Sequence, residues 1–196
     1  MADLTKTVQN LEQRGFVVHC FDTAEQAADY LDQQIDQTSV SFGGSITAQQ
    51  MGLYPRLAAH NQAIWHWEGG SALDAMTTDA YITSVNALAE TGELINIDGT
   101  GNRVAATFFG HRRIYFVVGI NKLAPDYDAA LWRARNIASP KNAQRLGRKT
   151  PCAAKGDRCY DCQSPERICR GLSVLWGPLM GAQVTEVLLI NQELGY

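Results

Sequence analysis

The sequence predicts an α/β fold with a mainly parallel sheet covered by helices, and three observations favour this class. First, strand patterns at 16–22, 39–42 and 63–67 alternate with helical patterns, and this β–α–β–α–β order is typical of parallel sheets. Second, RIYFVVGI at 113–120 is a nearly continuous apolar run, as expected for a strand that is buried on both faces. Third, 196 residues suit one domain with a sizeable core, so we expect a single domain over 1–196.

The helices of the first half and the glycine-rich middle have local signals of their own. We expect a helix at 3–14, then a second one begun by Thr23, which forms a capping box with Gln26. A third helix is expected at about 46–60. Residues 81–110 contain short apolar runs and four glycines, which indicate short strands and turns at a sheet edge or cleft.

The last third of the chain is expected to contribute one helix and two further strands. Asp126 begins a helical pattern over 126–140, and Pro140 is expected to end it because proline cannot donate the next hydrogen bond. Apolar runs at 172–176 and 184–190 are expected to return to the sheet.

Composition bounds the class of protein. An apolar share of 45% and a charged share of 19% describe a soluble globular chain and exclude a disordered one. No apolar run approaches the ~18 residues of a membrane span. The start, MADLTKTVQNLEQRGF, lacks the charged first residues and apolar run of a signal peptide, so we expect a cytoplasmic protein.

The net charge of −3 conceals a strong polarity along the chain. Residues 1–100 carry three basic and thirteen acidic side chains (−10), whereas residues 101–196 carry fourteen and seven (+7). The basic excess concentrates at 141–170, and such a segment attracts nucleic acid, an acidic partner or a phosphorylated ligand. The alternative is that these cations compensate nearby thiolates and otherwise face solvent.

Four of the five cysteines lie between Pro151 and Arg170, an insert that we place at 150–170, and we name it the cysteine segment. They are Cys152, Cys159, Cys162 and Cys169, with the spacing C-x6-C-x2-C-x6-C. In a reducing compartment such a group indicates a metal or redox site rather than disulfides. Four thiolates suit a 4Fe–4S cluster or a closed zinc site. Because only one C-x2-C pair is present, we favour iron–sulfur over zinc; free thiols or two disulfides remain the alternative.

The stretch SFGGSIT suggests a site for an anion. A strand that delivers Gly43 and Gly44 to the start of a helix presents free backbone N–H groups, and Ser45 and Thr47 add hydroxyl donors. That suits a phosphate or a carboxylate. The alternative is a plain tight turn with a serine cap.

The middle segment gathers polar side chains among small residues. A carboxylate beside a glycine turn acts as a base or nucleophile when desolvation raises its pKa, which makes Glu90 and Glu93 the catalytic candidates. The alternative for Glu90 is that it caps a turn or pairs at the surface. Arg103 is expected to hold an anionic group or to pair with Asp98. With the glycine turn, the full set of candidate ligand-binding residues is Gly43, Gly44, Ser45, Thr47, Asn86, Thr91, Gly92, Asn102 and Arg103. Trp65 and Trp67 alternate as strand residues do, and we interpret them as core and rim.

Several longer stretches together resemble the LUD-domain proteins, the lactate-utilisation family. They are SFGGSITAQQMGL, ITSVNALAETGELINIDGTGNRVAA, YFVVGINKL and ARNIASPKNAQRL, with the Thr-Pro-Cys start of the cysteine segment and the final ELGY. The resemblance implies a three-layer α/β/α fold like that of the ribose phosphate isomerase and coenzyme A transferase group. In that group the first strand–glycine loop–helix binds phosphate, and a Glu near the second glycine turn serves some relatives as nucleophile or base.

The residues and the resemblance support three hypotheses about function. The first is a redox accessory subunit with a 4Fe–4S cluster, acting with iron–sulfur partner proteins in the oxidation of L-lactate to pyruvate, as the resemblance implies. The second is a small-molecule enzyme of isomerase or transferase type with an anionic substrate, in which the cysteine segment is a structural metal site. The third is a nucleic-acid-binding or regulatory protein, against which the net charge and the lack of a DNA-reading motif count.

Overall fold

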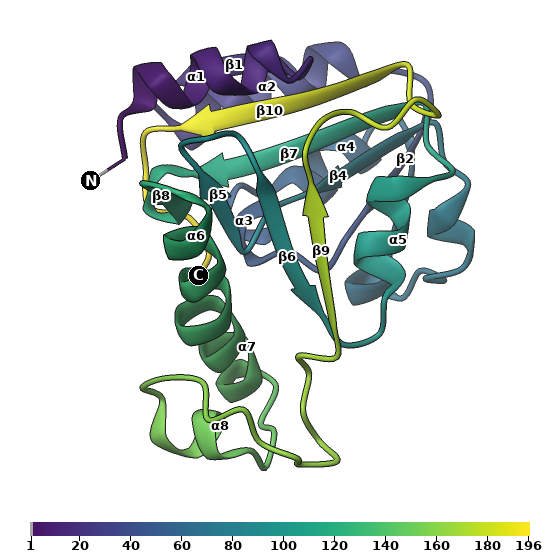
Figure 1. The fold of residues 1–196 in the computed structure, drawn as a ribbon. Helices are drawn as coiled ribbons and strands as arrows, with labels where there is room; N and C mark the ends of the chain where they lie inside the picture. Colours follow the sequence, from purple (N-terminus) through teal and green to yellow (C-terminus); the bar gives the residue numbers. More distant parts are fainter. Residues whose placement is uncertain (1) are drawn as a thin grey trace.

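A six-stranded parallel sheet forms the centre of the computed structural model, which describes residues 2–196 (Figure 1). The strand order is β1-β10-β7-β4-β2-β3, and every neighbouring pair is parallel. The strands are β1 (Val17–Phe21), β2 (Ser39–Phe42), β3 (Gln62–Trp65), β4 (Ala80–Thr83), β7 (Arg113–Gly119) and β10 (Val184–Ile190). The predicted α/β class with a mainly parallel sheet is therefore confirmed.

Side chains of the central strands alternate between two cores. Tyr115 and Val117 of β7 face one core, whereas Phe116 and Val118 face the other, and all four are buried. This explains why 113–120 is apolar without alternation. The first core lies under the helices α2 (Ala24–Gln34), α3 (Ile46–Gln50) and α4 (Leu53–Ala58).

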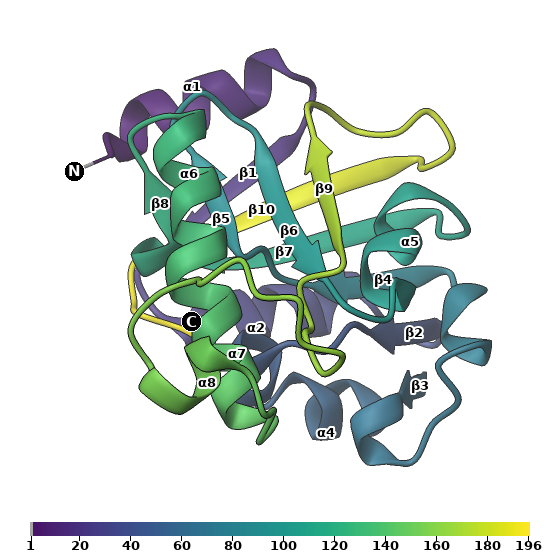
Figure 2. The same ribbon diagram turned by 60° about the horizontal axis from the view of Figure 1, so that its bottom comes forward.

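The second face of the main sheet is covered by helices and by a smaller sheet. Helices α1 (Leu4–Gln13) and α5 (Asn102–Phe108) pack there. Between them lies a four-stranded mixed sheet in the order β8-β5-β6-β9, visible in front of β7 and β10 in Figure 2. Its strands are β5 (Ala87–Ala89), β6 (Leu94–Asp98), β8 (Leu123–Ala124) and β9 (Gly171–Leu175). This face thus differs from a simple helix layer, and only the second of the two expected C-terminal strands, β10, enters the main sheet.

The small sheet in turn carries a helix on its outer side. Alanines of β5 and Ile95 pack against Ala130 and Ala134 of the helical rod that begins with α6 (Tyr127–Arg133). Small side chains permit this close approach of helix and sheet.

The predicted end of that helix at Pro140 was wrong. After α6 the chain passes through a π-helical turn (Ala134–Ala138) into α7 (Ser139–Arg145), and Pro140 lies in the first turn of α7. Proline needs no hydrogen-bond acceptor there, and the Ser139 hydroxyl donates to the Ala134 carbonyl oxygen at 2.8 Å. The rod therefore continues to Arg145.

Two other helical expectations differ from the structure. The helix predicted at 46–60 is broken into α3 and α4 at Gly52, whose φ of 62° lies in the left-handed region. Helix α5 lies in the segment 81–110, where only strands and turns were expected; it follows Gly101 and is too short to show a periodic pattern. Helices α1 and α2 confirm their predictions, including the capping box of Thr23 and Gln26.

Short elements complete the chain. Three 3-10 turns lie at His66–Glu68, Asp74–Met76 and Ile120–Lys122. The cysteine segment begins with α8 (Pro151–Lys155) and continues without regular structure to β9, beside the end of α7 (Figure 1). Within residues 2–196, no helix combines the length and apolarity needed to cross a membrane.

Candidate functional site

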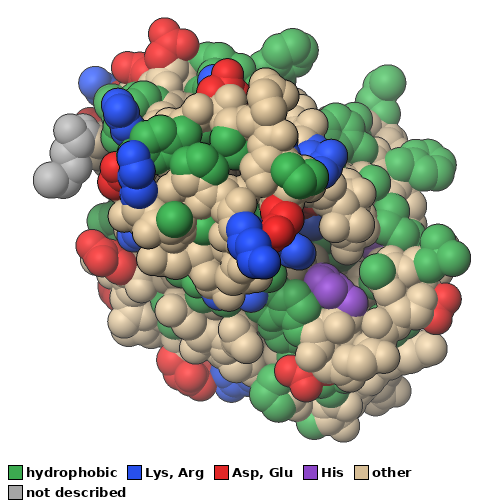
Figure 3. Space-filling model, turned by 90° about the horizontal axis from the view of Figure 1, so that it is seen from below, with side chains coloured by type: hydrophobic (Ala, Val, Ile, Leu, Met, Phe, Trp, Pro, Cys, Tyr) green, Lys and Arg blue, Asp and Glu red, His purple; other side chains and the backbone are tan. Residues whose placement is uncertain are grey.

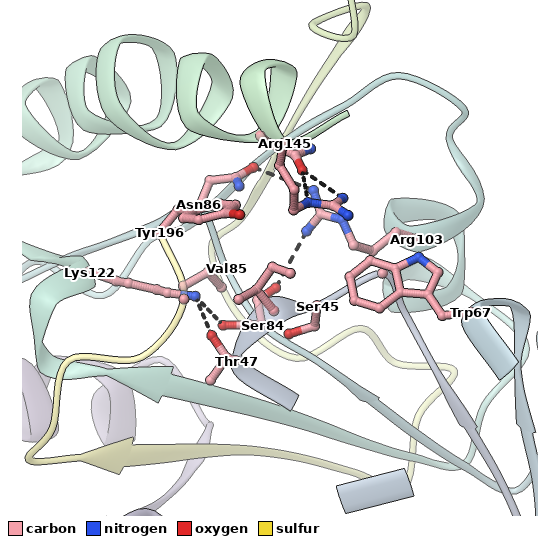
Figure 4. A pocket seen from close by; sticks show the side chains of 14 residues that line it. Ser45, Thr47, Trp67, Ser84, Val85, Asn86, Arg103, Lys122, Arg145 and Tyr196 are labelled. Carbon is pink, nitrogen blue, oxygen red and sulfur yellow. Dashed lines mark hydrogen bonds between the residues drawn. The ribbon is translucent and has the colours of Figure 1, made fainter. Parts of the chain in front are cut away.

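The candidate site lies where the chain leaves the carboxyl ends of β2, β4 and β7, which are neighbours in the main sheet. Ligands of open parallel sheets bind at this edge. A cavity of about 60 Å³, here the inner cavity, lies there (Figure 4). Its walls include Gly44, Ser45, Thr47, Trp67, Ser84, Asn86, Arg103, Lys122, Arg145 and Tyr196.

A second hollow of about 240 Å³, the outer cavity, adjoins the first. The two share Gly44, Trp67, Asn86, Arg103 and Arg145 among their walls. The outer cavity adds His66, Asp98, Asn102, Arg148 and Ile168. Together the cavities have room for a small molecule whose charged end enters the inner part.

Lys122 is the most unusual group at the site. It follows β7 directly, and only 4% of its surface is exposed. Its ammonium nitrogen Nζ donates hydrogen bonds to Thr47 Oγ1 at 2.7 Å and Ser84 Oγ at 2.8 Å. Within residues 2–196, no carboxylate lies within salt-bridge distance of Nζ. Burial lowers the pKa of Lys122 well below its ordinary value, and the positive charges of Arg133 and Arg103 lower that pKa further.

Arg103, by contrast, is fully engaged. Its guanidinium donates to Asp98 Oδ2 at 3.0 Å, to Asn96 Oδ1 at 2.5 Å and to the Ile97 carbonyl oxygen at 2.9 Å. Of the two roles expected for Arg103, the structure shows the pair with Asp98. Arg103 therefore fastens α5 to β6 and shapes both cavities, and its charge is compensated.

The far wall comes from α7 and from the segment after β3. The Arg145 guanidinium carbon Cζ lies 5.0 Å from the ring centroid of Trp67, a cation–π contact. Trp67 in turn stacks on Trp65 with 5.0 Å between ring centroids. Asn142 Oδ1 accepts two hydrogen bonds from Arg145, at 3.1 and 2.9 Å. Arg145 thus has a fixed direction at the rim.

The charges of the walls favour an anion. Four basic side chains, Arg103, Lys122, Arg145 and Arg148, line the two cavities, whereas Asp98 is the one acidic side chain among their lining residues and already pairs with Arg103. The His66 ring nitrogen Nδ1 is buried without a partner in the described chain, and burial lowers the pKa of this ring. A neutral imidazole there adds no charge but offers a polar contact.

The structure brings most of the predicted ligand-binding residues together. Gly44, Ser45, Thr47, Asn86 and Arg103 line the inner cavity, and Asn102 lines the outer one. The expected helix dipole contributes little, however, because α3 has five residues and the Ser45 hydroxyl accepts from the Ala48 backbone N–H. The side-chain cations, not the helix, carry the positive charge of the site.

Gly43 supports the site from behind. A Cβ at this position would lie 2.7 Å from Thr83 Oγ1 and 2.9 Å from Arg103 Cγ, and would also collide with the Tyr81 hydroxyl. The first glycine of the pair is thus required by close packing under the loop.

Glu90, Thr91, Gly92 and Glu93 form the turn between β5 and β6, away from both cavities. Glu90 Oε2 accepts from the Asp3 backbone N–H at 2.6 Å, and Glu93 Oε1 lies 2.5 Å from Arg14 Nη2. Both carboxylates therefore fasten the hairpin to α1. The surroundings of Glu90 agree with its alternative role at the surface, and the structure brings neither carboxylate to the cavities.

Several lining residues were not among the sequence candidates. These are Lys122, Arg145 and Tyr196, together with Trp67, which the sequence predicts as a core or rim residue. The sequence does contain a signal for Lys122. It stands two residues after the apolar strand pattern 113–120, and residues in that position reach the ligand edge of a parallel sheet.

The cysteine segment does not form a closed metal site in the described arrangement. Among residues 2–196, no three His, Cys, Asp or Glu side chains are placed to hold one metal ion. All four thiols are half-buried and free. The Arg167 guanidinium lies among them, 3.5 Å from Cys169 Sγ and 2.9 Å from the Cys162 carbonyl oxygen, while Cys152 Sγ contacts the Thr150 hydroxyl. The four thiols are thus spread along the segment in this conformation.

The lower end of the molecule has mixed charge. Seen from below, Lys and Arg side chains surround a few acidic ones, with a hollow beside them (Figure 3). Within the cysteine segment, Asp161 Oδ1 lies 3.3 Å from an Arg135 nitrogen and 3.9 Å from an Arg167 nitrogen.

Comparisons with known proteins agree with the fold. The family model described as LUD domain matches residues 4–190. A search of curated proteins found no match. The chain is similar to the crystal structure of a DUF162 family protein from Deinococcus radiodurans, with a TM-score of 0.55, 12% sequence identity and 95% of each chain covered. At this identity the similarity shows a shared fold alone.

Proposed function

The chain belongs to the LUD domain family, and on that premise we propose that the inner cavity binds the carboxylate of a small organic acid in L-lactate utilisation. The observation that supports this proposal is Lys122, a buried basic side chain without an acidic partner in residues 2–196, at the ligand edge of the sheet. A phosphate is the alternative anion for the same walls.

Burial removes the Lys122 amine from water. A buried ammonium group is costly unless an opposite charge pairs with it or it loses its proton. Asp98 does not compensate Lys122, because its carboxylate already accepts from Arg103. In the free protein Lys122 avoids this cost by losing its proton, and a bound carboxylate would be held by Arg145 at the rim and by the hydrogen-bonding amine of Lys122.

Calorimetric titration with pyruvate, L-lactate and inorganic phosphate tests the proposal. We expect at least one of the three to bind, and Lys122→Met to weaken that binding about 10- to 100-fold, since a hydrogen bond to a charged group contributes about 1.5–3 kcal/mol. Lys141→Met is the matched control, because Lys141 is exposed and lines neither cavity.

The outcomes separate the alternatives. No binding of any of the three anions contradicts the proposal, as does equal binding by wild type and Lys122→Met. Glu93→Gln is expected to leave binding unchanged, because Glu93 pairs with Arg14 away from the cavity. A loss of binding in Glu93→Gln would instead support the isomerase- or transferase-type alternative.

A second proposed function is that of a redox accessory subunit, favoured by four free thiols on one segment that has no regular structure after Gly156. A 4Fe–4S cluster would require Arg167 to withdraw from Cys169 and the thiols to gather. The basic residues of 141–170 would then meet an acidic surface of an iron–sulfur partner protein.

Metal analysis of protein purified without oxygen tests this second proposal. We expect a brown protein with about four irons per chain. Cys162→Ser should lose the iron, whereas Cys20→Ser should keep it, because Cys20 lies on β1 outside the segment. A colourless protein with stoichiometric zinc would indicate a structural metal site, and a metal-free protein would refute both.

A further inference from the structure

The hydrogen bonds around Lys122 have a fixed direction. The Thr47 hydroxyl lies 3.3 Å from the Leu194 carbonyl oxygen, and the Ser84 hydroxyl lies 2.6 Å from the Val117 carbonyl oxygen. A carbonyl oxygen can only accept, so each hydroxyl donates its single hydrogen there. Both hydroxyl oxygens must therefore accept from Lys122 Nζ.

This arrangement is complete for a neutral amine. A neutral amine has two hydrogens, and the two hydroxyl oxygens take both. Its lone pair then occupies the remaining position on Nζ. An ammonium group would instead place a third N–H there, and residues 2–196 provide no acceptor for it. The low pKa that burial and two neighbouring cations give Lys122 agrees with the neutral form.

We propose that Lys122 is a nucleophilic amine that forms a Schiff base with the carbonyl carbon of a 2-oxo acid. The inference rests on the proposed function, since the acid must first enter the inner cavity. It names the substrate class: a small acid with a carbonyl group next to its carboxylate, such as pyruvate.

The step balances without a further reactant. The Nζ lone pair attacks the carbonyl carbon, a C=N bond replaces the C=O bond, and the carbonyl oxygen leaves as water with the two hydrogens of the amine. Nothing is oxidised or reduced. Arg145, which also lines the inner cavity, provides positive charge for the carboxylate of the acid.

Lys122 differs from the other lysines of the chain. Lys6, Lys141, Lys149 and Lys155 are all exposed, whereas Lys122 is buried. Among the lysines, only Lys122 lines a described cavity. We therefore expect the 2-oxo acid to form an imine at Lys122 and not at the other four lysines.

Reductive trapping tests the inference. Borohydride adds hydride to an imine carbon and converts the Schiff base into a stable secondary amine. We expect the full chain, incubated with pyruvate and sodium borohydride, to gain one adduct, and peptide mapping to place it on Lys122. Lys141→Met should be trapped like the wild type, and Lys122→Met should not react.

The Schiff base can be refuted while the proposed binding site stands. Pyruvate binding measured by calorimetry without borohydride, combined with no trapped adduct, would overturn the Schiff base and leave the binding site standing. Adducts spread over exposed lysines would overturn it equally. Absence of binding by all three anions would refute the proposed function and this inference together. The mapping is done on wild-type protein, so the test does not depend on the folding of Lys122→Met.

Discussion

Two cations in the same cavity differ in how far their charges are compensated. Arg103 donates to a carboxylate, an amide and a carbonyl group, whereas Lys122 meets only two hydroxyls. A residue with a complete set of partners stabilises the fold, and a buried cation without an opposite charge is available for a ligand or for chemistry. This contrast supports the role proposed for Lys122.

The lowered pKa of Lys122 makes stability depend on pH in a defined direction. The unfolded chain holds this proton up to about the ordinary pKa of 10.5, whereas the folded chain loses it at a lower pH. Between these two pKa values the unfolded state binds more protons, so folding stability rises with pH. We expect the free energy of unfolding of wild type relative to Lys122→Met to increase as the pH rises toward the ordinary pKa of 10.5.

Urea unfolding at a series of pH values, in buffers without phosphate or carboxylates, measures this difference. Lys141→Met should follow the wild-type pH dependence, because Lys141 is exposed. Parallel curves for wild type and Lys122→Met would show that Lys122 keeps its ordinary pKa in the folded protein.

At the residue level, the cavity residues that could be predicted are those that directly follow a strand in the sequence. Gly44, Ser45 and Thr47 follow a strand directly, and their place at the ligand edge could be predicted. Arg145 and Tyr196 reach the same cavity from distant parts of the chain, which no local pattern reveals. Glu90 and Glu93 stand beside a glycine as expected, but the direction in which a hairpin turn points depends on tertiary packing, here against α1.

At the scale of elements, the loop after β2 depends on two glycines with different tasks. A Cβ on Gly43 would collide with Tyr81, Thr83 and Arg103, whereas a Cβ on Gly44 would meet the Trp67 ring at 3.3 Å. We expect Gly43→Ala to lower the free energy of unfolding by about 1–3 kcal/mol. Gly44→Ala should cost less and should mainly affect ligand binding, because Gly44 lines both cavities.

Denaturant unfolding of the two alanine variants, together with the anion titration, checks this expectation. Equal stability of the two variants would contradict the packing argument. Unchanged anion binding in Gly44→Ala would contradict the place given to this loop in the site.

The helical rod of α6 and α7 shows why one element boundary was mispredicted. Proline usually ends a helix because it lacks an N–H and clashes with the preceding turn. Here a π-helical turn places Pro140 at the start of α7, where the missing N–H has no cost. The continuation matters for function, since α7 delivers Asn142 and Arg145 to the cavity wall.

At the scale of the molecule, the fold class could be predicted because strand and helix patterns alternate along the first half. The small sheet could not, since it pairs β6 with β9 across more than seventy residues of chain. This pairing also brings the cysteine segment to the site: Ile168 lines the outer cavity, and its neighbour Cys169 lines an adjoining hollow with Cys159 and Arg167. The cysteine segment thus touches the outer cavity through Ile168 but contributes no residue to the inner one.

The central claim is that a small carboxylate binds at Lys122, and a crystal structure of the protein grown with pyruvate tests it most directly. We expect electron density for pyruvate in the inner cavity, either within hydrogen-bond distance of Lys122 Nζ or continuous with it. Density only at other sites, or an inner cavity that holds water alone at a pyruvate concentration that saturates binding in solution, would contradict the claim.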